Sequence, residues 1–115
     1  MKIDVNVTSL SGKKQQTFEI SHLVIAGWAG RDKEAMEHHI QELEALGIKR
    51  PTQTPTFYRV AANRLTTDSA IECSGGTSSG EVETIIIAQD GKLYVGLSSD
   101  HTDREVEAYG ITISK

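Results

Sequence analysis

The segment Glu81-Val82-Glu83 places two carboxylates two residues apart in a stretch with strand character. Residues i and i+2 of a β-strand point to the same face of the sheet, so we expect the two carboxylates to lie side by side. Two like charges at such a distance disfavour ionisation unless water, a shared proton or a cation compensates. A divalent cation that prefers oxygen ligands would do so, and Mg²⁺, Mn²⁺ and Ca²⁺ are the candidates. The alternative is a solvated strand face that binds nothing.

A second polar segment, residues 100–105, follows a predicted strand and contains three acids, one histidine and one arginine. Asp100 is the candidate for a third metal-binding carboxylate. The alternative is a polar loop that caps a helix beginning near Asp103. For Arg104 the alternative to a functional role is an ordinary ion pair with a neighbouring acid, namely Glu81, Glu83 or Glu107.

A third group, His39 and Glu42, lies within a predicted helix. Residues three apart are neighbours on a helix surface, so these two side chains can share a hydrogen bond. A carboxylate that orients a histidine is a common arrangement for a general base. The alternative is a core histidine with satisfied hydrogen bonds, because His39 falls on the apolar side of the helix. The spacing of histidine and cysteine residues does not predict a zinc site.

The helix is expected over residues 33–46. Asp32 is a suitable N-cap, and Gly47 suits the position just after the last turn. Apolar residues recur along this segment at helical spacing. They are Met36, Ile40 and Leu43, with Leu46 at the edge of the stripe.

The remaining segments have the composition and alternation of short β-strands, with Asp90-Gly91 as a hairpin turn. The strand at 81–88 contains three consecutive isoleucines, which we expect to be buried on both faces. The chain stops inside an apolar segment, so we expect its partner strand to lie elsewhere. The architecture predicted is α+β, with many short strands and one main helix. Strands are expected at 3–8, 17–20, 23–29, 56–61, 70–73, 81–88, 92–97 and 110–113.

Composition narrows the class of protein. The 115 residues suit a single domain. The 12 basic and 16 acidic residues give a net charge of −4, which argues against nucleic acid as a partner. No apolar run is long enough to span a bilayer, so no membrane association is expected. The single cysteine, Cys73, cannot form an internal disulfide, which favours the cytoplasm, and we expect it to be a small core residue.

Taken in order, the motifs resemble those of the fumarylacetoacetate hydrolase superfamily, and specifically an uncharacterised bacterial branch known as a domain of unknown function. The resemblance covers about residues 28–115. It rests on a helical His-x-x-Glu, a proline followed by a strand ending in a basic residue, Glu-x-Glu on a strand, and Asp-x-x-x-Arg. The corresponding segments are 39–42, 55–59, 81–83 and 100–104.

The resemblance implies a β-roll with mixed sheets and a divalent-metal-dependent hydrolase or lyase. Its substrate would be a small oxo-acid, converted by carbon–carbon bond cleavage, decarboxylation or hydration. The implied cofactor is Mg²⁺ or Mn²⁺, with Ca²⁺ as a further candidate. The implied metal ligands are Glu81, Glu83 and Asp100, the catalytic dyad is His39 and Glu42, and the substrate-binding residues are Arg59 and Arg104.

Members of that superfamily are considerably longer than this chain. The resemblance therefore implies that residues 1–115 form the N-terminal part of an incomplete catalytic domain. Such a part would form a homo-oligomer or associate with the missing C-terminal half. The alternative function is a non-catalytic binding or interaction domain that keeps the fold and a vestigial site.

Overall fold

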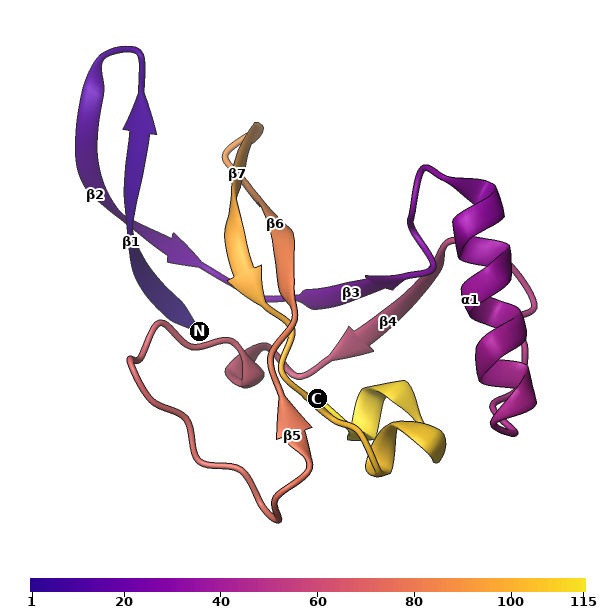
Figure 1. Ribbon diagram of the computed structural model, residues 1–115. Coiled ribbons are helices and arrows are strands. Elements are labelled where there is room, and N and C mark those ends of the chain that lie inside the picture. Colours follow the sequence, from indigo (N-terminus) through magenta and orange to yellow (C-terminus); the bar gives the residue numbers. More distant parts are fainter. The chain divides into compact units, whose positions relative to one another are not determined.

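A computed structural model describes all residues, 1–115, and shows two compact units. The first contains Met1–Leu23 and Val60–Lys115, and the second contains Val24–Arg59. Eight short strands pair as four two-stranded sheets, beside one α-helix and three 3₁₀-helices (Figure 1). The predicted α+β architecture with one main helix is confirmed, whereas the β-roll is not. None of the helices is long and apolar enough to cross a membrane.

The first hairpin supplies the core of the first unit. Strands β1 (Lys2–Ser9) and β2 (Gly12–Glu19) pair antiparallel, with Ile3 opposite Phe18. Both side chains are buried, and Phe18 retains only 1% of its exposed surface. The ring of Phe18 meets Tyr94 edge to face at a centroid distance of 4.8 Å. This contact joins the first hairpin to the second, and its two residues lie 76 positions apart in the chain.

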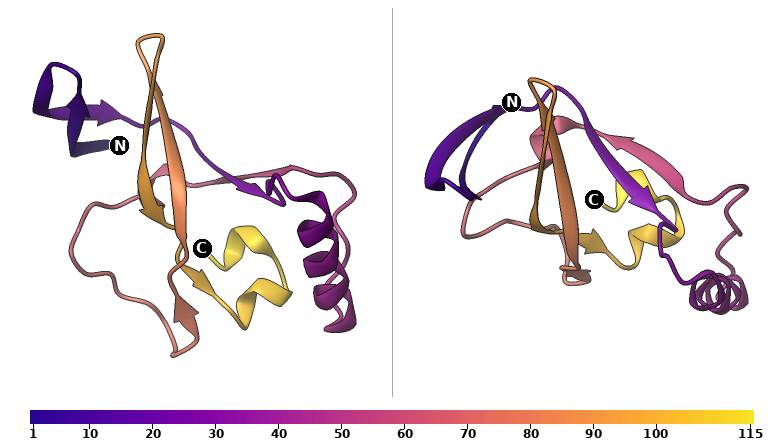
Figure 2. Two further views of the ribbon diagram at one scale, coloured as in Figure 1. Left: turned by 45° about the horizontal axis from the view of Figure 1, so that its top comes forward. Right: turned by 90° about the horizontal axis from the view of Figure 1, so that it is seen from above.

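The second hairpin contains β6 (Val82–Gln89) and β7 (Lys92–Ser99), drawn in orange in Figure 2. Asp90 and Gly91 both adopt positive φ, at 52° and 71°, as a two-residue hairpin turn requires. The Tyr94 hydroxyl accepts a hydrogen bond from Gln16 Nε2 at 3.2 Å, and Gln89 Oε1 accepts one from the Glu19 backbone N–H at 3.0 Å. One face of this hairpin therefore packs on β2.

The other face of the second hairpin is bare. Ile85 and Ile87 are half-buried, but Ile86, which points to the opposite face, remains 63% exposed. The prediction that the isoleucine run is buried on both faces is therefore wrong. The reason is that the first hairpin covers only one face of the second hairpin. No other segment of the first unit packs on the opposite face.

The second unit contains the helix and one strand pair. Helix α1 spans Lys33–Ala45, close to the predicted 33–46, and Gly47 follows it with φ of 86°. Ile40 is its one buried residue. Strand β3 (Leu23–Gly27) pairs with β4 (Thr56–Val60). Their residues alternate between half-buried and exposed, and β3 ends at Gly27, two residues before the end of the strand expected at 23–29.

Asp32 caps the helix as predicted. Its carboxylate accepts hydrogen bonds from the Glu34 and Ala35 backbone N–H groups, each at 3.0 Å. We expect Asp32→Ala to destabilise α1 by about 1 kcal/mol, because two N–H groups lose their protein partner. Hydrogen exchange at the amides of residues 34 and 35 measures this directly. Lys33→Ala, one residue along, is the control, and equal loss of protection in both variants would contradict the capping role.

The remaining elements of the first unit are short. Strand β5 (Ser78–Ser79) pairs antiparallel with β8 (Thr102–Asp103). The 3₁₀-helices are η1 (Ala62–Arg64), η2 (Val106–Ala108) and η3 (Ile111–Ile113).

Two predicted strands are absent. Residues 70–73 form no strand, and Cys73 is exposed rather than part of the core. Residues 110–113 form η3, which begins after Gly110, instead of a strand awaiting a partner. Ser114 explains the difference, because its hydroxyl and its backbone N–H both donate to the Ile111 carbonyl and close a local turn.

Candidate metal centre

Three carboxylates converge at the open end of the second hairpin. Glu83 is the second residue of β6, and Glu81 lies two residues before it, on the same face. The Asp100 backbone N–H donates to the Glu81 carbonyl at 2.8 Å, so the strand pairing continues past Val82 and places Asp100 opposite Glu81. One carboxylate oxygen from each of the three residues lies within 4.8 Å of the others. We call Glu81, Glu83 and Asp100 the acidic triad.

Glu83 is the carboxylate of the triad that is left without a partner. No hydrogen bond or ion pair reaches its side chain, whereas Glu81 and Asp100 each bind a cationic side chain. Partial burial, followed by the negative charges of Asp100 and Glu81, raises the pKa of Glu83 above its ordinary value; Lys115 opposes this shift. The ionised form of Glu83 is thus disfavoured by repulsion from the two other carboxylates. A bound cation would relieve this repulsion.

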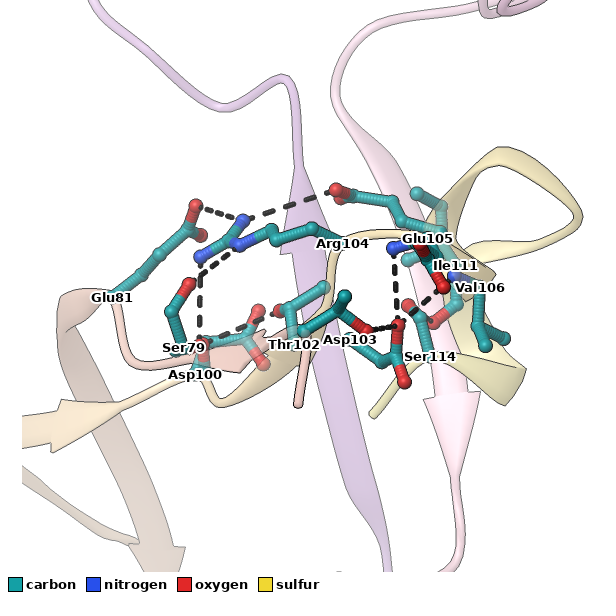
Figure 3. A network of polar contacts seen from close by, with 12 residues as sticks. Ser79, Glu81, Asp100, Thr102, Asp103, Arg104, Glu105, Val106, Ile111 and Ser114 are labelled. Atoms are coloured by element: carbon teal, nitrogen blue, oxygen red, sulfur yellow. Dashed lines mark hydrogen bonds and ion pairs between the residues drawn. The ribbon is translucent and has the colours of Figure 1, made fainter. Parts of the chain in front are cut away.

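Arg104 binds the Glu81 side of the triad. Its Nη1 donates to Glu81 Oε1 at 2.7 Å, and its Nε donates to Ser79 Oγ at 2.7 Å (Figure 3). A further carboxylate oxygen, Oε2 of Glu107, lies 3.8 Å from Nη1. The ion pair with Glu81 that the sequence suggested for Arg104 therefore forms, with Glu107 close by, and it leaves the proposed role in substrate binding untested. Arg104 fixes the orientation of Glu81 and leaves its second oxygen, Oε2, without a bond to the guanidinium.

Lys115 binds the Asp100 side of the triad. Its ammonium donates to Asp100 Oδ2 at 2.5 Å and to Thr102 Oγ1 at 2.7 Å. The side chains of Lys115 and Asp100 are only 8% and 14% exposed, so this ion pair is largely withdrawn from water. Thr102 is fully buried, and its hydroxyl also contacts the Asp100 carbonyl at 3.4 Å. The Asp100 carboxylate is consequently held in one position.

Asp103 holds the turn that carries these groups. Its Oδ1 accepts hydrogen bonds from the Thr77 hydroxyl and from the backbone N–H groups of Glu105 and Val106, at 2.9–3.1 Å. These hydrogen bonds lower the pKa of Asp103 below its ordinary value, and the bond from the Val106 N–H has the largest effect. Asp103 therefore caps the turn that leads into η2, whereas the N-cap residue of η2 itself, Glu105, makes no side-chain cap bond. Figure 3 shows this network beside Arg104 and Ser114.

The predicted dyad of His39 and Glu42 lies in the second unit. His39 Nδ1 is 3.5 Å from Glu42 Oε2, and His38 Nδ1 is 3.3 Å from Glu42 Oε1. Glu42 therefore lies between two histidines, His38 and His39. The His39 side chain is 61% exposed and its ring lies 5.8 Å from that of Trp28. It is not the core histidine offered as the alternative.

The candidate residues thus fall into two groups. The acidic triad and Arg104 lie together in the first unit, and the dyad lies with Arg59, an exposed residue of β4, in the second. Sequence reasoning missed Lys115 as the partner of Asp100 and Ser79 as the partner of Arg104. The strand register, once known, would have indicated Ser79, because Ser79 pairs with Thr102, two residues before Arg104.

The fold and the site define a small α+β protein with a cluster of three carboxylates beside two cationic side chains, Arg104 and Lys115. Residues 26–115 match the family described as Protein of unknown function (DUF2848), and the chain belongs to that family. No curated protein matches the chain. No solved structure matches it either.

The family match corrects one prediction. The motif order suggested membership of the fumarylacetoacetate hydrolase superfamily, but the family found over residues 26–115 is a different one, and no comparison points to that superfamily. The reason is the low information content of the motifs. Glu-x-Glu and His-x-x-Glu are two-residue patterns that arise readily on solvated strand and helix faces, so their order alone did not identify a family.

Proposed function

We propose that the acidic triad binds one divalent cation, Mg²⁺ or Mn²⁺ in the first place and Ca²⁺ as the further candidate. The observation that carries this proposal is the unpartnered Glu83 carboxylate between two carboxylates that are held in place. The donors are hard anionic oxygens, which these cations prefer over nitrogen or sulfur.

The spacing of the oxygens suits one ion. Ligands on opposite sides of a single ion are separated by twice the metal–oxygen distance, about 4.2 Å for Mg²⁺ and about 5 Å for Ca²⁺. The triad oxygens, within 4.8 Å of one another, fall in this range after small side-chain adjustments. Arg104 and Lys115 each engage one oxygen of Glu81 and Asp100, so the remaining oxygens stay available.

We further propose that the cation serves a hydrolase or lyase reaction on a small oxo-acid. A divalent cation supplies Lewis-acid polarisation of a carbonyl or carboxylate oxygen. Lys115 uses two of its three N–H groups on Asp100 and Thr102, and its positive charge beside the triad favours an anionic ligand. Arg104 is the candidate for substrate binding beside the triad. In the second unit, taken by itself, the pair of His39 and Glu42 is the candidate for a base and Arg59 for binding an anionic group. The free thiol of Cys73 supports a reducing, cytoplasmic setting.

The second candidate function is a non-catalytic binding domain. Glu81, Glu83 and the His39 side chain are solvent-exposed, whereas catalytic groups usually line a cleft that excludes water. Shallow hollows lie at residues 47–52 with Glu44 and between β2 and the turn at Gln89–Asp90. Neither contains a residue of the triad or the dyad. A cation at the triad would then serve structure or binding.

Thermal melts with EDTA, Mg²⁺, Mn²⁺ or Ca²⁺ test cation binding. A cation at 100 times its Kd should stabilise the native chain by about 2.7 kcal/mol. We expect this rise for the wild type and its loss in Glu83→Gln, with Glu19→Gln, an exposed strand glutamate elsewhere, as the control. Equal stabilisation of all three proteins would show that the triad is not the site. If the cation binds but none of a panel of oxo-acids is consumed, the result favours the non-catalytic binding domain over the hydrolase or lyase.

The same variant has a second expected effect in EDTA. Because the pKa of Glu83 is raised on folding, its ionisation opposes folding, and stability falls as pH rises through the ordinary carboxyl value of 4.5 and above. Glu83→Gln should therefore melt about 1–3 °C above the wild type at pH 7, since charge effects at exposed sites are small. The difference should vanish near pH 3, where the native glutamate is protonated in both states.

A further inference from the structure

The bare face of the second hairpin is apolar over most of its length. Cross-strand pairing puts the even-numbered residues of β6 and the odd-numbered residues of β7 on this face. Five of its eight side chains are large and apolar and remain 63–83% exposed. They are Val82, Ile86, Leu93, Val95 and Leu97, and we call them the hairpin patch.

The face also lacks charge. Its other three residues are Thr84, Ala88 and Ser99, so none of the eight positions is ionisable. Charged residues make up 24% of the chain, and the net charge is −4. A charged partner would find nothing here to pair with. Two copies of this chain repel each other through their net charge, and this neutral face is where they can meet with the least repulsion.

We propose that the hairpin patch is a twofold interface at which two copies of this chain stack β6–β7 face to face. An apolar patch of several hundred Å² is at the upper limit of what monomeric proteins expose. An exposed Val, Leu or Ile side chain offers on the order of 100 Å² of apolar surface, so the five offer about 400 Å² per copy. The three small residues add little to this area, which stays below the roughly 800 Å² per partner of a standard stable complex, so we expect a weak dimer.

The geometry suits a second copy in particular. A twofold axis brings the same surface of both copies together, so that surface must complement itself. An uncharged, apolar sheet face does so, and two such faces pack about 10 Å apart, as in a β-sandwich. The acidic triad lies on the opposite face of the hairpin, beside Ile85 and Ile87, because Glu81 and Glu83 are odd-numbered in β6. Dimer formation therefore leaves the proposed metal site open.

Sedimentation velocity of the 115-residue chain over about 1–200 μM tests the proposal. We expect the wild type to convert from monomer to dimer in this range. Val95→Glu and Leu97→Lys, which place charges of opposite sign in the patch, should each shift the midpoint at least tenfold to higher concentration. Leu10→Glu is the matched control, because Leu10 is a fully exposed apolar residue in the turn of the first hairpin; it should dimerise as the wild type does.

Three outcomes would overturn the proposal. They are a wild type that stays monomeric at 200 μM, an open-ended series of larger species, and patch variants that dimerise as the wild type does. Circular dichroism of each variant verifies that the fold is retained, and the wild-type result decides the matter even if one variant does not fold. Cation binding measured in Val95→Glu keeps the two proposals separate, because it should match that of the wild type.

Discussion

Phe18→Ala should lower the free energy of unfolding by about 3–5 kcal/mol, the usual cost of truncating a buried aromatic residue. Phe18 is one of only three buried apolar residues, at 1% exposure, and its ring is edge to face with Tyr94. The variant loses transfer energy, leaves a cavity and removes the main apolar contact between the two hairpins. Urea denaturation followed by far-UV circular dichroism measures the loss.

Phe57 provides the matched control for this substitution. It lies in β4 and is 65% exposed, so Phe57→Ala should change stability by no more than about 0.5 kcal/mol. If both phenylalanine variants lost the same stability, the packing of β1–β2 against β6–β7 would not be the principal source of stability. A loss confined to Phe18→Ala would identify this contact as the core of the first unit.

The elements that were predicted correctly are those whose signals are local. Asp32 and Gly47 bracket α1, because an N-cap carboxylate and a positive-φ glycine act within a few residues. Asp90-Gly91 determines its hairpin for the same reason, since both residues tolerate positive φ. A helix cap or a tight turn needs no information about the rest of the chain.

The errors arose where burial depends on a distant segment. The isoleucine run of β6 resembles a doubly buried strand, but Ile86 is exposed because only β2 covers the hairpin. Residues 110–113 have strand composition, yet the hydroxyl of Ser114 closes a 3₁₀ turn on Ile111. Periodicity describes which residues can share a face and does not specify what covers that face.

The candidate site also has one part that local sequence signals predict and one part that depends on distant segments. The proximity of Glu81 and Glu83 follows from strand geometry, and Asp100 joins them because the hairpin register sets it opposite Glu81. The choice of Lys115 as the partner of Asp100 depends on how η2 and η3 return the chain to β8, which no local pattern encodes. Sequence analysis therefore found the acids and missed one of the two cations beside them.

Lys115→Met should lower the free energy of unfolding by about 3 kcal/mol. Removing one partner of a largely buried ion pair leaves the other charge uncompensated, and here it leaves Asp100 beside two further carboxylates. Methionine keeps an apolar stem of the same length as that of lysine as far as Cε and lacks the ammonium, so the loss reports the ammonium and its bonds to Asp100 and Thr102. Lys92→Met, at an exposed position of β7, is the control and should stay within about 0.5 kcal/mol of the wild type.

A double-mutant cycle and the addition of Mn²⁺ then separate two effects of Lys115. One is its ion pair with Asp100, and the other is its positive charge beside the proposed cation site. Lys115→Met combined with Asp100→Asn should cost less than the sum of the single variants, because neither charge remains unpaired. If the triad binds a divalent cation, Mn²⁺ should stabilise Lys115→Met more than the wild type, since the ion replaces the missing positive charge beside Asp100. Additive losses would mean that the ion pair contributes nothing specific. Equal stabilisation of both proteins by Mn²⁺ would place the ion away from Asp100.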